Sequence, residues 1–213
     1  TQVRIEKVET NIVKLVIPQE IEGKPVMAIA HDACAMLGSI EEVCVPAQLQ
    51  EIGAYAFRNC KNLKVAKLAC EADVYEPSWL KNCNALEELY IPQNATELKP
   101  NIFDNSGLRK LHLGRSLSKI EPGMFAKSKL EELTIDKANE NLETDGCGIY
   151  ALDGDKELLA LAMPCAEYSI AKDCKVIGKK ATSGFAQLEK IEVPASVRVI
   201  GEFAFAKTSI GEF

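Results

Sequence analysis

The stretch IEEVCVPAQLQEIGAYAFRNCKN, residues 40–62, returns along the chain with changes that keep its apolar positions. Similar stretches start at Leu86, Leu108 and Leu188, and a weaker copy starts at Leu63. The starts at 40, 63, 86, 108 and 130 are separated by 23, 23, 22 and 22 residues. A period of about 20–29 residues with leucine at fixed offsets is typical of a leucine-rich solenoid, in which each repeat forms one coil and packs on the next.

Each repeat has its own internal pattern, counted here from its first residue as offset 0. Apolar residues stand at offsets 0, 3 and 5, as in Leu86, Leu89 and Ile91. Because side chains alternate along an extended chain, offsets 3 and 5 face the same side and predict a short, one-sided strand. Proline often follows at offset 6 and ends that strand. Large apolar residues recur at offsets 12 and 17, and a proline at offset 14 in three copies suits the first position of a short helical turn.

This pattern predicts an α/β solenoid in one domain, residues 1–213. We expect a right-handed leucine-rich-repeat array with a parallel sheet on one face and short helical turns or irregular segments on the other. Residues 139–164 hold two apolar runs around Asp153-Gly154, which predicts one inserted β-hairpin. Residues 210–213 begin another strand without a polar cap, so we expect a continuation of the array or a partner at the C-terminal end. The repeats start near residues 12, 40, 63, 86, 108, 130, 165 and 188.

A second motif recurs with the strands. It reads Val45-Pro46, Ile52-Gly53, Ala56-Phe57 and Cys60 in one repeat, and Val193-Pro194, Ile200-Gly201 and Ala204-Phe205 in another. In this motif the chain resembles the BspA-like leucine-rich-repeat family, and the resemblance covers nearly its whole length. The resemblance implies a bacterial secreted or surface protein, extracellular or on the cell surface, with a role in adhesion or host interaction. A signal or anchor is not visible in the chain.

Composition and motifs exclude several classes of function. A net charge of -6 argues against a nucleic-acid partner, and no apolar run approaches the roughly 18–20 residues that span a membrane. The chain has no P-loop, no G-x-S-x-G, no H-E-x-x-H and no dinucleotide glycine motif. Its two histidines, His31 and His112, stand in non-adjacent repeats without a nucleophile at a matching offset. We therefore predict no enzyme, no catalytic residue, no metal and no cofactor.

The outward face of the strands is the candidate site. Offsets 1, 2 and 4 point away from the core, and between Glu41 and Glu132 the sign of their charge alternates from repeat to repeat. Neighbouring strands lie roughly 5 Å apart, so opposite charges can pair and hold the coils together. Alternatively, this concave face binds a ligand around Tyr90 and His112. The candidate ligand-binding residues are Glu87, Glu88, Tyr90, Arg109, Lys110, His112, Glu131 and Glu132.

We predict a non-enzymatic module that binds a protein or a glycan on the concave face. The alternative is a structural spacer or stalk, in which the charged rows only hold the repeats together and no ligand is bound. A third interpretation is an enzyme with its site near the hairpin at residues 139–164. An activity that disappears when this hairpin is deleted from an intact fold would support the third interpretation.

The eight cysteines generate the first prediction. Cys60 and Cys83 share one offset in adjacent repeats, and Cys34 stands at the offset of Phe57, so these three are expected in the core. Parallel stacked side chains do not point at one another, and no C-x-x-C occurs. Mass spectrometry of alkylated native protein should count eight free thiols, and protected pairs would contradict the buried ladder of thiols.

Overall fold

The structure is a computed structural model that describes residues 2–68, 74–75, 79–98, 107–126 and 128–211. The chain forms two compact units, residues 1–117 and 118–213, and each unit is treated by itself. The described residues hold strands and turns and no helix. The expectation of one domain over residues 1–213, and that of a right-handed winding, stay predictions.

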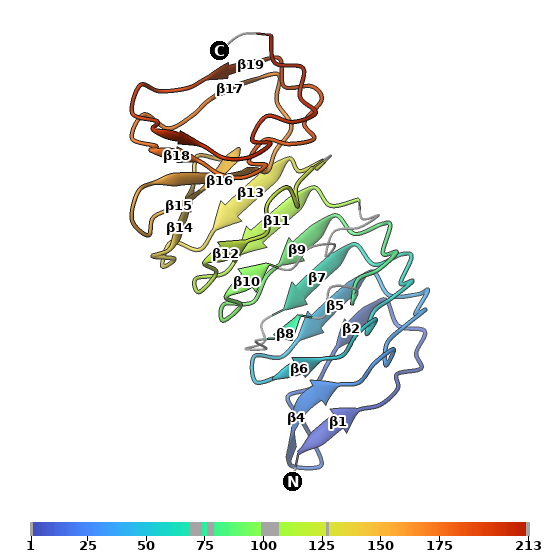
Figure 1. The fold of residues 1–213 in the computed structure, drawn as a ribbon. Coiled ribbons are helices and arrows are strands. Elements are labelled where there is room, and N and C mark those ends of the chain that lie inside the picture. Colours follow the sequence, from blue (N-terminus) through green and yellow to red (C-terminus); the bar gives the residue numbers. More distant parts are fainter. Residues whose placement is uncertain (1, 69–73, 76–78, 99–106, 127, 212–213) are drawn as a thin grey trace. The chain divides into compact units, whose positions relative to one another are not determined.

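The first unit contains two sheets of short strands (Figure 1). In the main sheet, β2, β5, β7, β9 and β11 are parallel and follow one another in chain order. In the second sheet, β1, β4, β6 and β8 are parallel, and β3 pairs antiparallel with β4. The strands are β1 (Val3–Ile5), β2 (Lys14–Val16), β3 (Glu20–Ile21), β4 (Lys24–Ile29), β5 (Glu42–Val45), β6 (Glu51–Ile52), β7 (Val65–Leu68), β8 (Val74–Tyr75), β9 (Glu88–Tyr90), β10 (Glu97–Leu98) and β11 (Lys110–Leu113).

The register of the main sheet stacks the same offset of successive repeats. Val43, Ala66, Leu89 and Leu111 occupy paired positions on four neighbouring strands, and all four are fully buried. Fully burying one leucine stabilises a fold by roughly 1.5–3 kcal/mol. A one-residue slip of any strand would turn its apolar row to solvent, so this row fixes the register of the coils. The predicted strands and their buried offsets are confirmed.

For the other face of the solenoid we predicted short helical turns or irregular segments, and the described residues contain turns and no helix. After the second strand of a coil, the chain makes a turn with two residues of positive φ four positions apart, such as Tyr55 (φ 60) and Asn59 (φ 59). Here the N–H of Phe57 donates to the carbonyl of Trp79 in the next coil (2.9 Å) rather than to a helical partner. Of the three prolines at offset 14, Pro122 lies in a turn beside Gly123 (φ 79), and Pro77 and Pro100 fall outside the described residues. The architecture is therefore a β-solenoid rather than an α/β one.

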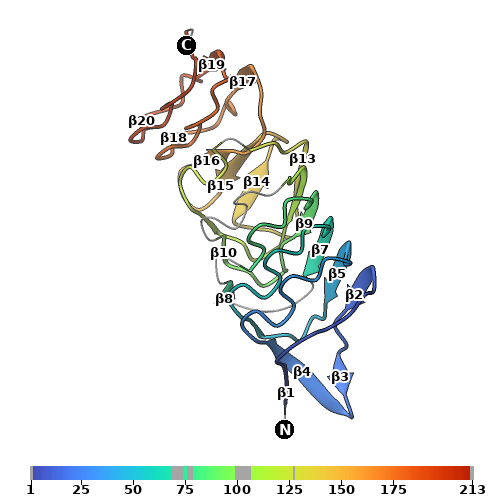
Figure 2. The same cartoon turned by 90° about the vertical axis from the view of Figure 1, so that its right-hand side faces the viewer.

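The second unit contains the insertion. Its strands β14, β15 and β16 are antiparallel in sequence order, and the loop that joins β15 to β16 carries Gly154 at φ 84, as the hairpin prediction required. β16 then pairs in parallel with β18, and β18 with β20, so the insertion supplies a regular second strand (Figure 2). β17 pairs with β19. The strands are β12 (Lys119–Ile120), β13 (Glu132–Ile135), β14 (Leu142–Thr144), β15 (Gly148–Ala151), β16 (Glu157–Leu161), β17 (Glu167–Ser169), β18 (Val176–Ile177), β19 (Lys190–Glu192) and β20 (Val199–Ile200).

A carboxylate ties the insertion to the coil that follows it. Asp145 Oδ1 accepts from the N–H of Cys147 (2.9 Å) and of Gly148 (2.7 Å). Asp145 Oδ2 accepts from the hydroxyls of Tyr150 (3.1 Å) and Tyr168 (2.7 Å), which also contact each other at 2.6 Å. Burial raises the pKa of the Tyr150 phenol to about 12, so both tyrosines remain neutral donors at ordinary pH. A Cβ at Gly148 would stand 2.0 Å from the Tyr168 hydroxyl, which explains the glycine.

The core cysteines are thiols with no partner sulfur. Cys60 Sγ donates to the carbonyl of Cys34 (3.2 Å), and Cys83 Sγ donates to the carbonyl of Phe57 (3.1 Å). Burial raises the pKa of Cys34 and Cys83 to about 12 and that of Cys60 to about 11. Thiolate is therefore scarce at these three positions, and they should react slowly with alkylating reagents. Cys70 lies outside the described residues, so the count of eight stays a prediction.

The close approach of neighbouring coils at Gly53 gives a prediction of stability. A Cβ on Gly53 would stand 2.5 Å from the backbone nitrogen of His31, whereas a Cβ on Gly38 would meet nothing within 4 Å. Gly53→Ala should lower the free energy of unfolding by about 1–3 kcal/mol, since the coils must move apart. Gly38→Ala is the matched control and should change it by less than about 1 kcal/mol. Urea unfolding measures both, and equal effects of the two variants would contradict the close-packed interface.

Candidate interaction face

The outward side of β5, β7, β9 and β11, here called the strand face, carries six of the eight predicted site residues. Glu88 and Tyr90 lie on β9, and Lys110 and His112 lie on β11 directly opposite them. Glu87 and Arg109 precede these strands, and the N–H of Arg109 donates to the carbonyl of Glu87 (2.9 Å). The strand residues among them alternate with the buried Leu89 and Leu111 and so face outward, and the exposed Glu87 and Arg109 adjoin them.

The remaining two predicted residues belong to the second unit. Glu131 precedes β13 and Glu132 is its first residue, and both are exposed. Their alternation with the buried Leu130 and Leu133 follows the same offsets as in the first unit. That Glu131 and Glu132 form one binding site with the other six residues stays a prediction.

Tyr90, His112 and Glu88 form a partly buried cluster at the middle of the strand face. The rings of Tyr90 and His112 stack at 4.1 Å between centroids and 19° between planes. Glu88 Oε1 accepts from the Tyr90 hydroxyl (2.7 Å) and lies 3.2 Å from His112 Nε2. The side chains of His112 and Glu88 are only 18% and 25% exposed, and Tyr90 is half-buried. The stacked ring of Tyr90 covers one face of the His112 ring.

A second carboxylate organises the N-terminal part of the face. Glu42 Oε1 lies 3.1 Å from Lys14 Nζ on one neighbouring strand and 3.2 Å from Lys67 Nζ on the other. Lys64 also pairs with Glu41 at 2.8 Å. These contacts match the predicted pairing of opposite charges between coils. Sequence reasoning did not include Glu42 in the candidate site, although the alternating charges at offset 2 could have identified it.

The two carboxylates titrate below the ordinary range because of these partners. Hydrogen bonds from Lys14 and Lys67 lower the pKa of Glu42. The hydrogen bond from the Tyr90 hydroxyl lowers the pKa of Glu88, with a smaller contribution from His112. Both groups are thus ionised at neutral pH, and the face presents fixed negative charge beside lysine ammonium groups.

Glu88 and His112 form the contact at the centre of this face. Across the described residues, no three histidine, cysteine or acidic side chains gather as metal ligands would. Among those residues, no helix could cross a membrane either.

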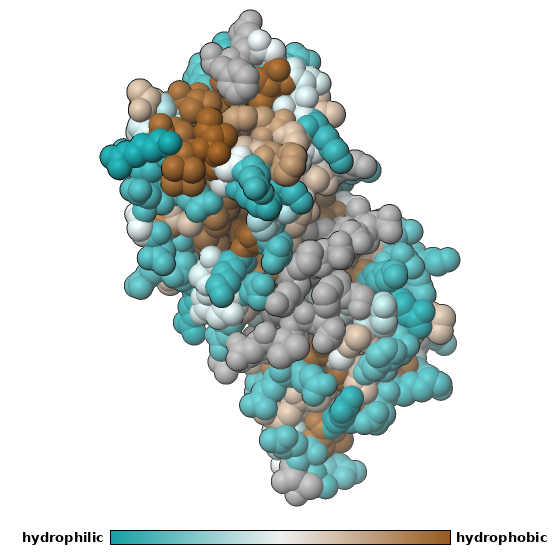
Figure 3. Space-filling view, in the orientation of Figure 1, coloured by the Kyte–Doolittle hydropathy of each residue, from teal (hydrophilic) through white to brown (hydrophobic). Residues whose placement is uncertain are grey.

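A separate apolar surface lies in the second unit. Val199 and Ile200 of β20 are 52% and 55% exposed, although the equivalent Ile177 on β18 is fully buried. Figure 3 shows hydrophobic surface over β18 and β20, in contrast to the polar surroundings. The equivalent residues of β4, β6 and β10, which are Ile29, Ile52 and Leu98, are buried as well.

The depressed pKa of Glu42 gives a pH prediction. A carboxylate whose pKa is lower in the folded state stabilises the fold above its unfolded pKa, and this stability is lost as the pH falls through the folded pKa. Glu42→Gln should therefore lower the unfolding free energy at pH 7 by up to about 1 kcal/mol per lost pair and have little effect near pH 3. Glu22→Gln, in an exposed turn, is the control. Urea unfolding at both pH values checks this, and an effect of Glu42→Gln that does not depend on pH would contradict it.

Comparisons with known proteins agree with this architecture. A family model described as BspA type leucine rich repeat region, in six copies, matches residues 27–146 and 162–213. No curated protein matches the chain. A leucine rich cell surface protein from Faecalibacterium prausnitzii A2-165 has a similar structure, with a TM-score of 0.55, 17% identity and coverage of 99% of this chain and 71% of that chain.

Two further solved structures are similar. The leucine-rich repeat protein from Eubacterium ventriosum ATCC 27560 has a TM-score of 0.59 and 20% identity over 92% of this chain and 51% of that chain. The leucine-rich repeat protein from Bacteroides ovatus ATCC 8483 has a TM-score of 0.59 and 19% identity over 96% and 51%. The chain thus spans about half the length of these two proteins, and at such identities the likeness concerns the fold alone. Because the family model matches well over half of its residues, the chain belongs to the BspA-type leucine-rich-repeat family.

Proposed function

We propose that this chain is a non-enzymatic recognition module of a bacterial secreted or cell-surface protein, and that it binds a protein partner through the strand face. Membership of the repeat family supports a bacterial surface protein, and the similar Faecalibacterium protein is described as a cell surface protein. Extracellular or cell-surface localisation is part of the proposal.

The observation that carries the proposal is the cluster of Tyr90, His112 and Glu88. Aromatic residues in a partly desolvated centre with a charged rim are typical of the residues that dominate protein interfaces. Here the stacked rings at 4.1 Å form such a centre, and Glu87, Arg109 and Lys110 surround it with charge of both signs. The rings are already held in place by Glu88, so a partner would order few side chains on binding.

The ion pairs of Glu42 support the alternative, a structural spacer with no ligand. Lys14, Glu42 and Lys67 satisfy one another across three strands and so hold coils together without leaving a charge for a partner.

At the second unit, the exposure of Ile200 supports the separate proposal that a further coil or a partner covers that end. The N–H of Ser209 and of Gly211 already donate to Leu188 and Glu189 (both 3.0 Å), in the register of another strand.

The test is a binding screen of the intact chain against an array of extracellular proteins and glycans. It runs beside a variant with Tyr90, Arg109, Lys110 and His112 changed to serine. The matched control changes Tyr55, Arg58, Lys61 and Lys81 to serine, a similar set of residues that lies in or beside the turns. Circular dichroism and urea unfolding establish that both variants remain folded.

A protein partner on the strand face predicts at least about a tenfold loss of affinity in the first variant and little change in the control. Equal binding by the first variant and the intact chain would remove the site from the strand face. A glycan bound there in place of a protein would change the class of partner, and binding to nothing on the array would favour the spacer.

A further inference from the structure

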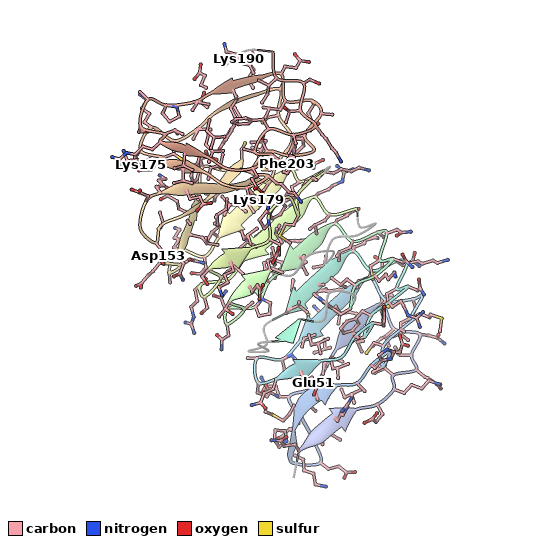
Figure 4. The ribbon with its side chains drawn as sticks, viewed as in Figure 1. Glu51, Asp153, Lys175, Lys179, Lys190 and Phe203 are labelled. Atoms are coloured by element: carbon pink, nitrogen blue, oxygen red, sulfur yellow. The ribbon has the colours of Figure 1, made fainter. Side chains whose placement is uncertain are left out.

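The first unit contains a hollow of about 470 Å³ at its second sheet, which is separate from the strand face. Arg4 of β1 and His31, just after β4, contribute two of its side chains, and residues 50–54 around β6 contribute the rest. Figure 4 labels Glu51 on β6, next to β4. Ile52, only 1% exposed, and Gly53 give the hollow an apolar part. Both its volume and this mixture of apolar and polar lining are in the range of small-molecule sites.

The strand register places Arg4 and Glu51 on either side of Ala28. β1 pairs Arg4 with Ala28 of β4, and β4 pairs Ala28 with Glu51 of β6, so the three residues form one row across three strands. Neighbouring strands lie about 4.8 Å apart, which separates the backbones of Arg4 and Glu51 by roughly 10 Å. The next positions, Ile29 and Ile52, are buried, so this row faces outward. Arg4 and Glu51 thus stand two strands apart in this row, and both line the hollow.

Several polar groups at the hollow are not used by the fold. In the residues that the structure describes, the Gln50 amide and the Glu51 carboxylate make no hydrogen bond or ion pair with protein. Arg4 has a long contact of 3.5 Å with Glu6, a residue that is itself exposed. His31 uses Nδ1 to contact Asp32 at 3.2 Å, which leaves Nε2 uncommitted. The strand face differs in this respect, because its carboxylates are held by neighbouring side chains.

The chemistry of these groups indicates one class of ligand. The lining of the hollow carries one guanidinium, of Arg4, and one carboxylate, of Glu51, so neither sign of charge dominates it. A carboxylate only accepts hydrogen bonds, a guanidinium only donates, and an amide does both. Adjacent hydroxyl groups, each of which donates and accepts, satisfy such a set together. The His31 ring, which packs edge-on against Tyr55 at 5.5 Å between centroids, offers an apolar edge for the carbons of a sugar ring.

We propose that this hollow is a binding site for a neutral saccharide, held by the Glu51 carboxylate, the Gln50 amide and the Arg4 guanidinium. The site lies on a different sheet from the one proposed to bind a protein, and it neither requires nor excludes that partner. A chain with both sites could engage a glycosylated surface through the hollow and a protein through the strand face.

The test is NMR titration of the intact ¹⁵N-labelled chain with glucose, galactose, N-acetylglucosamine, maltose, lactose and cellobiose. At least one sugar should shift the amide signals of residues 50–54 and of His31 in a saturable way. Glu51→Gln keeps the shape and removes the charge, and it should weaken that binding about tenfold, the loss expected for a hydrogen bond to a charged group. Glu97→Gln is the matched control, because Glu97 occupies the same offset of β10 outside the lining.

A second variant tests the space of the hollow without changing any charge. Ala54→Leu, at a lining residue, should fill the hollow and abolish the shifts, and its ¹⁵N spectrum without sugar reports whether the fold is intact. The proposal is overturned if no sugar shifts these signals, or if Glu51→Gln and Glu97→Gln bind equally. It is also overturned if glycine or dialanine shifts them and no sugar does, since the site would then be one for a zwitterion.

Discussion

The fold depends on backbone hydrogen bonds that run between coils in both directions. Where a coil enters its first strand, an N–H donates to the preceding coil, as Lys64 does to Glu41 (2.8 Å). In the turns an N–H donates to the following coil, as Phe57 does to Trp79 (2.9 Å). Each coil must therefore match both neighbours at two places. An extra residue between strand and turn would break one of the two ladders and leave buried N–H groups unpaired, which explains the spacing of 22 or 23 residues between the successive repeats that start from 40 to 130.

The turn geometry follows from the same constraint. Asp32, Tyr55, Lys180 and Phe203 stand at equivalent positions with φ between 55° and 60°, although none is glycine. A left-handed residue of this kind costs on the order of 1 kcal/mol. Hydrogen bonds between coils offset this cost, because the conformation directs alternate N–H groups toward the next coil. Asp32 donates to Ala54 at 3.2 Å, and Lys180 donates to Glu202 at 3.0 Å. Ladder bonds between coils thus override the local preference for a helical turn.

The conformation of the turns is the part of the fold that could not be predicted from the sequence. The strand positions and the buried row through Leu89 follow from alternation, which depends only on neighbouring residues and was predicted in full. For the turns the sequence left short helical turns and irregular segments both open, because proline at offset 14, as in Pro122, suits a helix start as well as a turn. Nothing local distinguishes the two, since the deciding partner is a carbonyl about 22 residues away. In the candidate site, the repeat offsets correctly predicted that Tyr90 and His112 are neighbours. They did not predict that the Glu88 carboxylate contacts both side chains.

The two candidate sites differ in how they relate to the period. Where the repeat is regular, every outward side chain has an equivalent on the next strand, and selection for stacked coils favours pairs such as Lys67 and Glu42 that satisfy each other. Where the period is broken, this complementarity is lost. β1 lies outside the repeats, and the first full repeat is lengthened by a loop, so Arg4 and Glu51 flank an alanine rather than each other. Unused polar groups are therefore expected at irregular coils, and a search for small-ligand sites in such arrays should begin there rather than on the regular face.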